Sequence, residues 1–155
     1  MKPATIVRGF HPMYAEIDAA FGIRGRPTVL SWGDKIYIAI GNPQLPAPVV
    51  AHENAHGERQ LEYGLILPGA PLALLPPDVR IAAWWKRYIA DAFFRRQEEI
   101  IAHRAEYEFL CKHSGSKNDQ RRYLGIVATK LSQPFCGLTK AEARKVLSDV
   151  NPPRS

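Results

Sequence analysis

The sequence predicts an α+β domain that is mostly helical, with a β-hairpin near its N-terminus and helices over the rest of the chain. Two β-prone runs, 28–32 and 35–40, flank Gly33-Asp34, a pair typical of a hairpin turn. Apolar residues recur at helical spacing in several segments that proline and glycine separate. With 155 residues, the chain has the length of one domain and can bury a core without disulfides.

The first half of the chain predicts a short helix, the hairpin and a longer helix. Residues 13–21 carry apolar side chains at helical spacing, and Gly22 is a typical helix stop. After the hairpin, Pro46 and Pro48 lie where a helix would begin, because the first turn tolerates proline. We therefore expect a second helix over 49–63.

The middle of the chain predicts an irregular segment and then two helices. Residues 65–77 contain several prolines and are expected to be irregular. Asp78 is expected to cap a long helix, with a break near Arg95 and Arg96. Residues 98–111 then continue as helix.

The C-terminal part predicts two further helices after a polar linker. Residues 114–118 are polar and are expected to be flexible. Residues 120–131 have a helical pattern, and Thr139 with Glu142 forms a capping box that opens the last helix.

The net charge of +6 lies mainly in this C-terminal part. Residues 114–155 hold eight Lys and Arg against three Asp and Glu, whereas residues 1–113 hold thirteen against twelve. We therefore divide the chain into a domain over 1–113 and a basic helical extension over 114–155, packed on it or tethered to it. Such an extension could contact nucleic acid or an acidic partner. A solvated face is favoured, because no aromatic residues are interleaved with the charges.

The cysteines and the hydropathy pattern indicate a cytoplasmic protein without membrane contact. Cys111 and Cys136 form no disulfide framework and no C-x-x-C pair, and are expected to be reduced. The N-terminus lacks the pattern of a signal peptide, and no apolar run reaches the roughly 18 residues that a membrane span needs.

The segment from His52 to His56 is a complete H-E-x-x-H motif on the second predicted helix. Residues four apart lie on the same helix face, so the two imidazoles can hold one metal ion. Glu53 lies beside that ion, where it can take a proton from a bound water. Small apolar neighbours of the histidines favour a packed site over a solvated surface helix.

A later helix face carries Glu99, His103 and Glu106 at positions i, i+4 and i+7. Buried ionisable groups are costly unless they are paired or bound to metal, so this face is a candidate source of a third ligand. The alternative for Glu98 and Glu99 is an ordinary charged face that pairs with the nearby arginines.

The order of helix, hairpin, motif helix and downstream helix over residues 10–110 resembles the minimal core of the zincin metallopeptidases. The metzincin branch is excluded, because Arg59 and Glu62 occupy the positions where it has glycine and histidine. The segment from Glu99 to His103 reads E-I-I-A-H and resembles the E-x-x-A-(D/H/Y) segment of the gluzincin branch.

The resemblance implies a zinc ion held by His52, His56 and Glu99, with Glu98 and then Glu106 as alternative third ligands. Glu53 would be the general base that takes a proton from water and passes it to the leaving amine. His103 would hold a ligand carboxylate or face the substrate.

The same resemblance implies how a peptide would bind. The strand over 35–40 would pair with an extended substrate. Four side chains are candidates for a further donor to the developing oxyanion: Tyr63, Tyr88, His103 and Tyr107.

Three functions follow from these observations. The first is a small zinc peptidase, similar to the metallopeptidase-like proteins of phages and prophages, which would be cytoplasmic or virion-associated. The second is a non-catalytic zinc-binding scaffold that serves as a virion structural or protein-binding module. The third is a basic protein that binds nucleic acid through residues 114–155.

Overall fold

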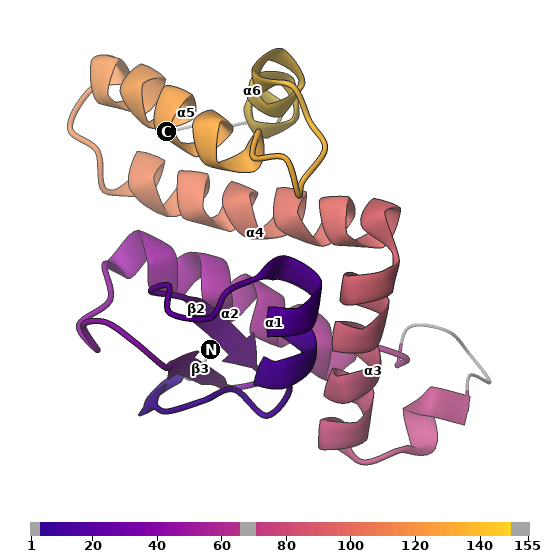
Figure 1. Ribbon diagram of the computed structural model, residues 1–155. Coiled ribbons are helices and arrows are strands. Elements are labelled where there is room, and N and C mark those ends of the chain that lie inside the picture. Colours follow the sequence, from indigo (N-terminus) through magenta and orange to yellow (C-terminus); the bar gives the residue numbers. More distant parts are fainter. Residues whose placement is uncertain (1–3, 66–70, 150–155) are drawn as a thin grey trace.

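The computed structural model describes residues 4–65 and 71–149 and shows an α+β fold that is mostly helical, as predicted (Figure 1). The helices are α1 (Tyr14–Phe21), α2 (Ala47–Glu62), α3 (Pro77–Ala90), α4 (Ala92–Lys112), α5 (Lys117–Leu131) and α6 (Lys140–Ser148), with a 3₁₀ turn over Pro71–Leu74. The strands are β1 (Thr5–Arg8), β2 (Val29–Trp32) and β3 (Lys35–Ile38).

The strands form one sheet in the order β1-β3-β2. The hairpin of β2 and β3 was predicted, and Gly33 makes its turn with a φ of 57°. β1 was not predicted; it pairs with β3 in parallel, so β3 is the central strand. The free edge of the sheet beside the hairpin therefore belongs to β2.

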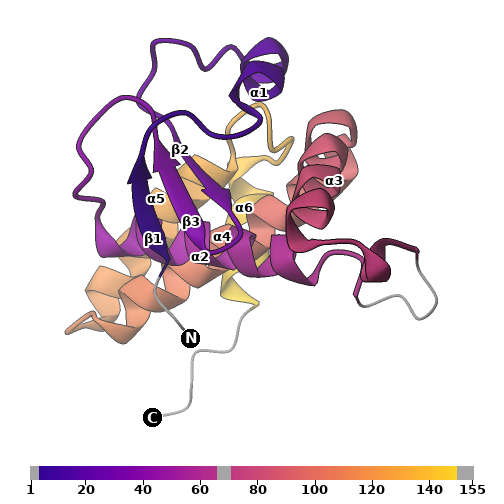
Figure 2. The ribbon, with the colours of Figure 1, turned by 90° about the horizontal axis from the view of Figure 1, so that it is seen from below.

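The elements are stacked in layers. α2 crosses one face of the sheet, α4 packs against α2, and α5 and α6 pack on the far side of α4 (Figures 1 and 2). α3 runs steeply across one end of α2 and α4 and joins the layers there (Figure 1). The contact between α2 and α4 is thus the middle of the molecule.

Two apolar cores lie on either side of this middle layer. The first joins α1, α3 and the start of α4, and its buried residues are Met13, Ile17, Ile81, Trp84, Trp85, Tyr88 and Phe94. The second joins α4 to α5 and α6, and its buried residues are Ile100, Val127, Ala128, Leu131, Cys136, Ala143 and Leu147. A polar cluster on facing sides of α2 and α4 separates the two cores.

The helix ends follow local capping chemistry, with two corrections. Gly22 ends α1 in the left-handed region, and the capping box of Thr139 and Glu142 opens α6 as predicted. The break between α3 and α4 lies at Asp91 rather than near Arg95, because the Asp91 side chain accepts hydrogen bonds from the backbone of the first turn of α4. Asp78, predicted as a cap, lies inside the first turn of α3.

The C-terminal extension packs directly on α4. The predicted linker over 114–118 is shorter than expected, because Ser116 caps α5 with its side chain and the helix begins at Lys117. Arg96 donates to the Cys136 carbonyl at 3.0 Å, and Arg104 donates to the Val146 carbonyl at 2.9 Å. Side chains of α4 therefore hydrogen-bond to the connection before α6 and to α6 itself.

Cys111 and Cys136 are free thiols, and Cys136 is buried in the second core. Within the described residues, no helix combines the length and the hydropathy that a membrane crossing requires.

Candidate metal centre

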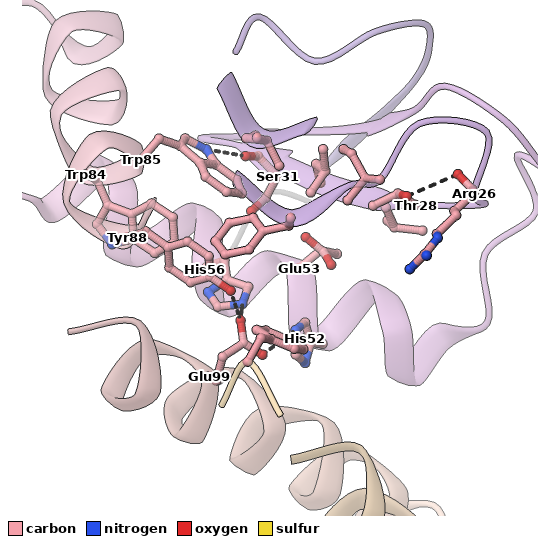
Figure 3. A pocket seen from close by; sticks show the side chains of 16 residues that line it. Arg26, Thr28, Ser31, His52, Glu53, His56, Trp84, Trp85, Tyr88 and Glu99 are labelled. Atoms are coloured by element: carbon pink, nitrogen blue, oxygen red, sulfur yellow. Dashed lines mark hydrogen bonds and ion pairs between the residues drawn. The ribbon is translucent and has the colours of Figure 1, made fainter. Parts of the chain in front are cut away.

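The structure brings His52 and His56 of α2 together with Glu99 of α4. His56 Nε2 lies 3.2 Å from Glu99 Oε1, and His52 Nε2 lies 4.0 Å from Glu99 Oε2. The histidines are one helical turn apart, and Figure 3 shows Glu99 reaching from α4 to both rings. The three predicted ligands therefore converge on one point between the two helices.

The spacing and the donor set suit zinc. One nitrogen from each histidine and one Glu99 oxygen all lie within 4.8 Å of one another. Tetrahedral zinc with bonds of about 2.0–2.2 Å places its ligand atoms roughly 3.3 Å apart, so small side-chain rotations would close the set. Two imidazoles and one carboxylate, which leave a position free, form the usual ligand set of a catalytic zinc.

Packing holds the two imidazoles in place. The ring of His56 lies edge-on to Trp84 and Tyr88, with ring centroids 5.6 and 6.1 Å away. The ring of His52 lies 4.4 Å from that of His103. Burial, helped by the neighbouring imidazoles, lowers the pKa of His52 to about 3, so its ring is neutral and able to bind metal at physiological pH.

His56 and Glu99 are arranged as an ion pair. Burial opposes charge on His56, but its hydrogen bond to Glu99 and the charge of that carboxylate raise the pKa of His56 overall. Burial likewise opposes charge on Glu99, but His56 outweighs it and brings the pKa of Glu99 to about 2. Glu99 is thus a buried carboxylate that stays ionised, as a metal ligand must.

Tyr88 of α3 fixes the orientation of Glu99. Its hydroxyl donates a hydrogen bond to Glu99 Oε1, the oxygen that also faces His56. Its ring stacks on Trp84 at a centroid distance of 4.9 Å, within the first core. The ligand carboxylate is therefore held by a hydroxyl that the apolar core positions.

Glu53 lies beside this point and is buried. Burial raises the pKa of Glu53 to about 7, and the opposing effects of His56 and of hydrogen bonds from Ser31 are smaller. A carboxylate that titrates near neutral pH is well matched to exchanging a proton with water.

The alternative third ligands have other partners. Glu98 faces away from the histidines and forms a bidentate ion pair with Arg59, at 2.9 and 3.2 Å. The alternative in which Glu98 and Glu99 pair with Arg95 or Arg96 is not formed, since those arginines donate to carbonyls of the α5–α6 connection. Because Glu98 is buried in this pair with Arg59, it is not part of the candidate metal centre.

Glu106 lies among charged groups behind the candidate ligands. Its Oε2 lies 3.0 Å from His103 Nδ1 and 3.8 Å from His52 Nδ1. Lys130 of α5 forms an ion pair with its other oxygen. The hydrogen bond of Glu106 goes to His103 and not to His52, and Lys130 links the C-terminal extension to this pair. Glu106, His103 and His52 also form a possible ligand group, but the adjacent lysine disfavours a second cation.

A glutamine one turn beyond His56 fixes strand β2 next to the motif. Gln60 accepts a hydrogen bond from Gly33 N at 2.8 Å and donates to the Ser31 carbonyl at 3.2 Å. Trp85 donates to the same carbonyl at 3.1 Å. The hairpin approaches so closely that a Cβ on Gly57 would lie 2.1 Å from the Gly33 carbonyl oxygen. Glycine at this helix position is therefore required for the approach.

A cavity of about 380 Å³ opens onto the cluster. Its polar lining includes Glu53, both motif histidines and Glu99, and its apolar lining comes from α1, β2, α3 and the α5–α6 connection. Tyr88 is the only one of the four candidate oxyanion donors in this lining; Tyr63, His103 and Tyr107 are not part of it.

No protein-family model, curated protein or solved structure matches this chain at a significant level, so the interpretation of the site depends on its geometry.

Sequence reasoning missed Gln60, Gly57 and Lys130. The two residues of α2 had a usable signal, since they extend the polar and small face of the motif helix by one turn. Lys130 had none, because its role depends on how α5 packs across α4.

Proposed function

We propose that this protein is a zinc-dependent peptidase of the zincin type, with His52, His56 and Glu99 as ligands and Glu53 as general base. The observation that carries the proposal is the convergence of three donor groups from two helices, two of them buried, beside a carboxylate whose pKa lies near 7. The cavity in front of them supplies room for a substrate.

The residues present fit a zinc ion, and each would have a separate task. A zinc ion held by these three groups would supply a Lewis acid for a carbonyl oxygen and would make a water molecule more acidic. Glu53 would accept the proton of the attacking water on its carboxylate and deliver it to the nitrogen of the leaving amine. Tyr88 would hold Glu99 in place through the hydrogen bond that its hydroxyl donates to the carboxylate.

The substrate would lie along β2 rather than along the strand proposed from the sequence. β3 has partners on both sides, so it has no free edge to offer a peptide. In β2, the Ser31 carbonyl points away from β3, and Trp85 and Gln60 donate hydrogen bonds to it. Backbone groups two residues apart point the same way, so those of Val29 face the free edge, and Val29 lines the cavity.

The test is cleavage of denatured protein by zinc-loaded wild type and by Glu53→Gln. The proposal expects the variant to bind zinc as wild type does and to lose at least about 100-fold in rate, as loss of a general base does. Full activity of the variant would refute the mechanism. An inactive wild type whose fold depends on zinc would favour the scaffold function instead. Binding of nucleic acid that weakens steeply with salt, without cleavage, would favour the third function.

A further inference from the structure

We propose that the substrate of this site carries a bulky apolar side chain on one side of the cleaved bond and a carboxylate on the other. The inference rests on the proposed peptidase function and adds the substrate class. Two features of the cavity carry it: an aromatic end beside Tyr88 and a single arginine, Arg26, at the opposite end (Figure 3).

The apolar end is formed by side chains from three separate parts of the chain. Phe21 of α1 lies 6.3 Å from Tyr88 and 6.5 Å from Phe135, measured between ring centroids. The guanidinium of Arg95 lies over the Phe21 ring, 5.3 Å from its centroid. Ile17 and Ile23 complete this wall of the cavity. An apolar surface next to a charged reaction centre excludes polar side chains and gains free energy from burying an apolar one.

The size of the cavity limits what can enter. A volume of about 380 Å³ lies at the lower end of the range for small-ligand sites. It accommodates one large side chain and a short length of backbone rather than a folded domain. An extended peptide along β2 presents alternate side chains to the cavity, so one residue beside the cleaved bond fills the apolar end.

Arg26 gives the other end a positive charge. Among the described residues that line the cavity, it is the only Lys or Arg, and no ion pair involves it. Its neighbour Arg24 differs, because it pairs with Asp18 at 3.0 Å and does not line the cavity. Glu53 lies between Arg26 and the aromatic end, so a carboxylate on the substrate avoids its charge best when it lies near Arg26 (Figure 3).

The test uses octapeptides of alanine that carry one Phe or no Phe, with Glu, Gln or Lys within three positions on either side. Each is made with a free C-terminus and as an amide, which separates a side-chain carboxylate from a terminal one. Cleavage is followed by mass spectrometry. Binding is measured by calorimetry on Glu53→Gln, with and without zinc, so that a preference is detected even where no bond is cleaved.

The expected result is a preference of about tenfold or more for Phe-containing over all-alanine peptides, from burial of an aromatic side chain. Peptides with a carboxylate should be cleaved faster, and bound more tightly, than their Lys counterparts by about fivefold, which is the range of an exposed ion pair. Arg26→Glu should invert the second preference, and Phe135→Ala should reduce the first. Phe135 is 45% exposed, so its replacement does not threaten the fold. Arg24→Glu, which changes the net charge by the same amount outside the cavity lining, and the exposed Phe93→Ala are the matched controls.

Two results would overturn the inference. Cleavage without either preference would refute the substrate class and leave the peptidase function standing. Inverted preferences in the Arg24 control would show that Arg26 acts only through the net charge. Binding with both preferences but no cleavage would support the substrate class and refute the peptidase function.

Discussion

His56 Nε2 lies 3.2 Å from Glu99 Oε1, and this contact joins α2 to α4 in the middle of the molecule. The pair is buried between two apolar cores, and Tyr88 of the first core donates a hydrogen bond to Glu99. A buried ion pair is weak evidence for stability, because desolvation offsets most of its attraction. Its position next to a second histidine and a carboxylate of raised pKa is better explained by metal binding and catalysis.

Tyr88→Phe tests the support of the third ligand. The change removes the hydroxyl that donates to Glu99 Oε1 and leaves the ring packed on Trp84. We expect zinc affinity to fall about tenfold, since loss of a partner to a metal ligand costs 10–100-fold. Competition with a chelator measures this, with Tyr123→Phe on α5 as the control. Equal affinities for Tyr88→Phe and wild type would contradict the assigned role.

Lys130→Met tests whether the C-terminal extension contributes to the metal centre. The variant keeps the aliphatic stem but leaves Glu106 without its cation, while the His103 contact at 3.0 Å remains. We expect zinc affinity to fall about tenfold or more, with Lys130→Arg restoring part of it. Lys145→Met is the control, because Lys145 forms no ion pair among the described residues. If Lys130→Met and Lys145→Met both bind zinc as tightly as wild type, Lys130 does not contribute to the metal centre.

Gly57→Ala tests the close approach of the hairpin to α2. A Cβ there would lie 2.1 Å from the Gly33 carbonyl oxygen, a backbone atom that cannot move alone. We expect a loss of about 3 kcal/mol in the free energy of unfolding, at the upper end for overpacking. The same substitution at Gly125 of α5 meets only the end of the Arg144 side chain, at 3.4 Å. It should gain up to about 1 kcal/mol from helix propensity. Chemical denaturation of both variants decides the point.

The buried His11 should make the free energy of unfolding fall in mild acid, whether or not metal is bound. Burial lowers the pKa of His11 to about 4, against an opposing hydrogen bond with the Ser31 carbonyl. Its Nδ1 accepts a hydrogen bond from Met13 N at 3.0 Å, so the neutral ring is the form that fits. The folded state thus binds fewer protons than the unfolded state between pH 6.5 and about 4. Stability is present above pH 6.5 and falls by about 3 kcal/mol as the pH drops through that window.

His11→Asn isolates this effect, since its amide oxygen can still accept from Met13 N. The variant should show a flatter dependence of unfolding free energy on pH between 4 and 6.5, whatever its absolute stability. An unchanged slope would contradict the assignment to His11.

Local chemistry made much of the fold predictable. Gly22, the Gly33 turn and the box of Thr139 and Glu142 act within a few residues, so their elements could be placed from sequence. The motif spacing predicted the pairing of His52 with His56, and the polar face around Glu99 predicted the helix that meets them.

Long-range packing made the rest unpredictable. β1 is only four residues long and depends on β3 for its partner, so the central position of β3, and with it the free edge of β2, could not be inferred. Arg59 and Glu98 are far apart in sequence, and only the contact of α2 with α4 shows that they pair. The break at Asp91 was missed because the apolar helical spacing continues across it from Ile89 to Phe93, and the cap depends on its backbone geometry.

The most direct test of the metal centre is zinc binding by wild type, Glu99→Gln and Glu98→Gln under the same conditions. Elemental analysis gives the stoichiometry and chelator competition the affinity. The metal centre described here predicts one zinc per chain in wild type, loss of at least about 100-fold in affinity for Glu99→Gln, and retention of zinc by folded Glu98→Gln, whose partner is Arg59. A wild type that binds no zinc, or a Glu99→Gln variant that binds it as tightly as wild type, would contradict it.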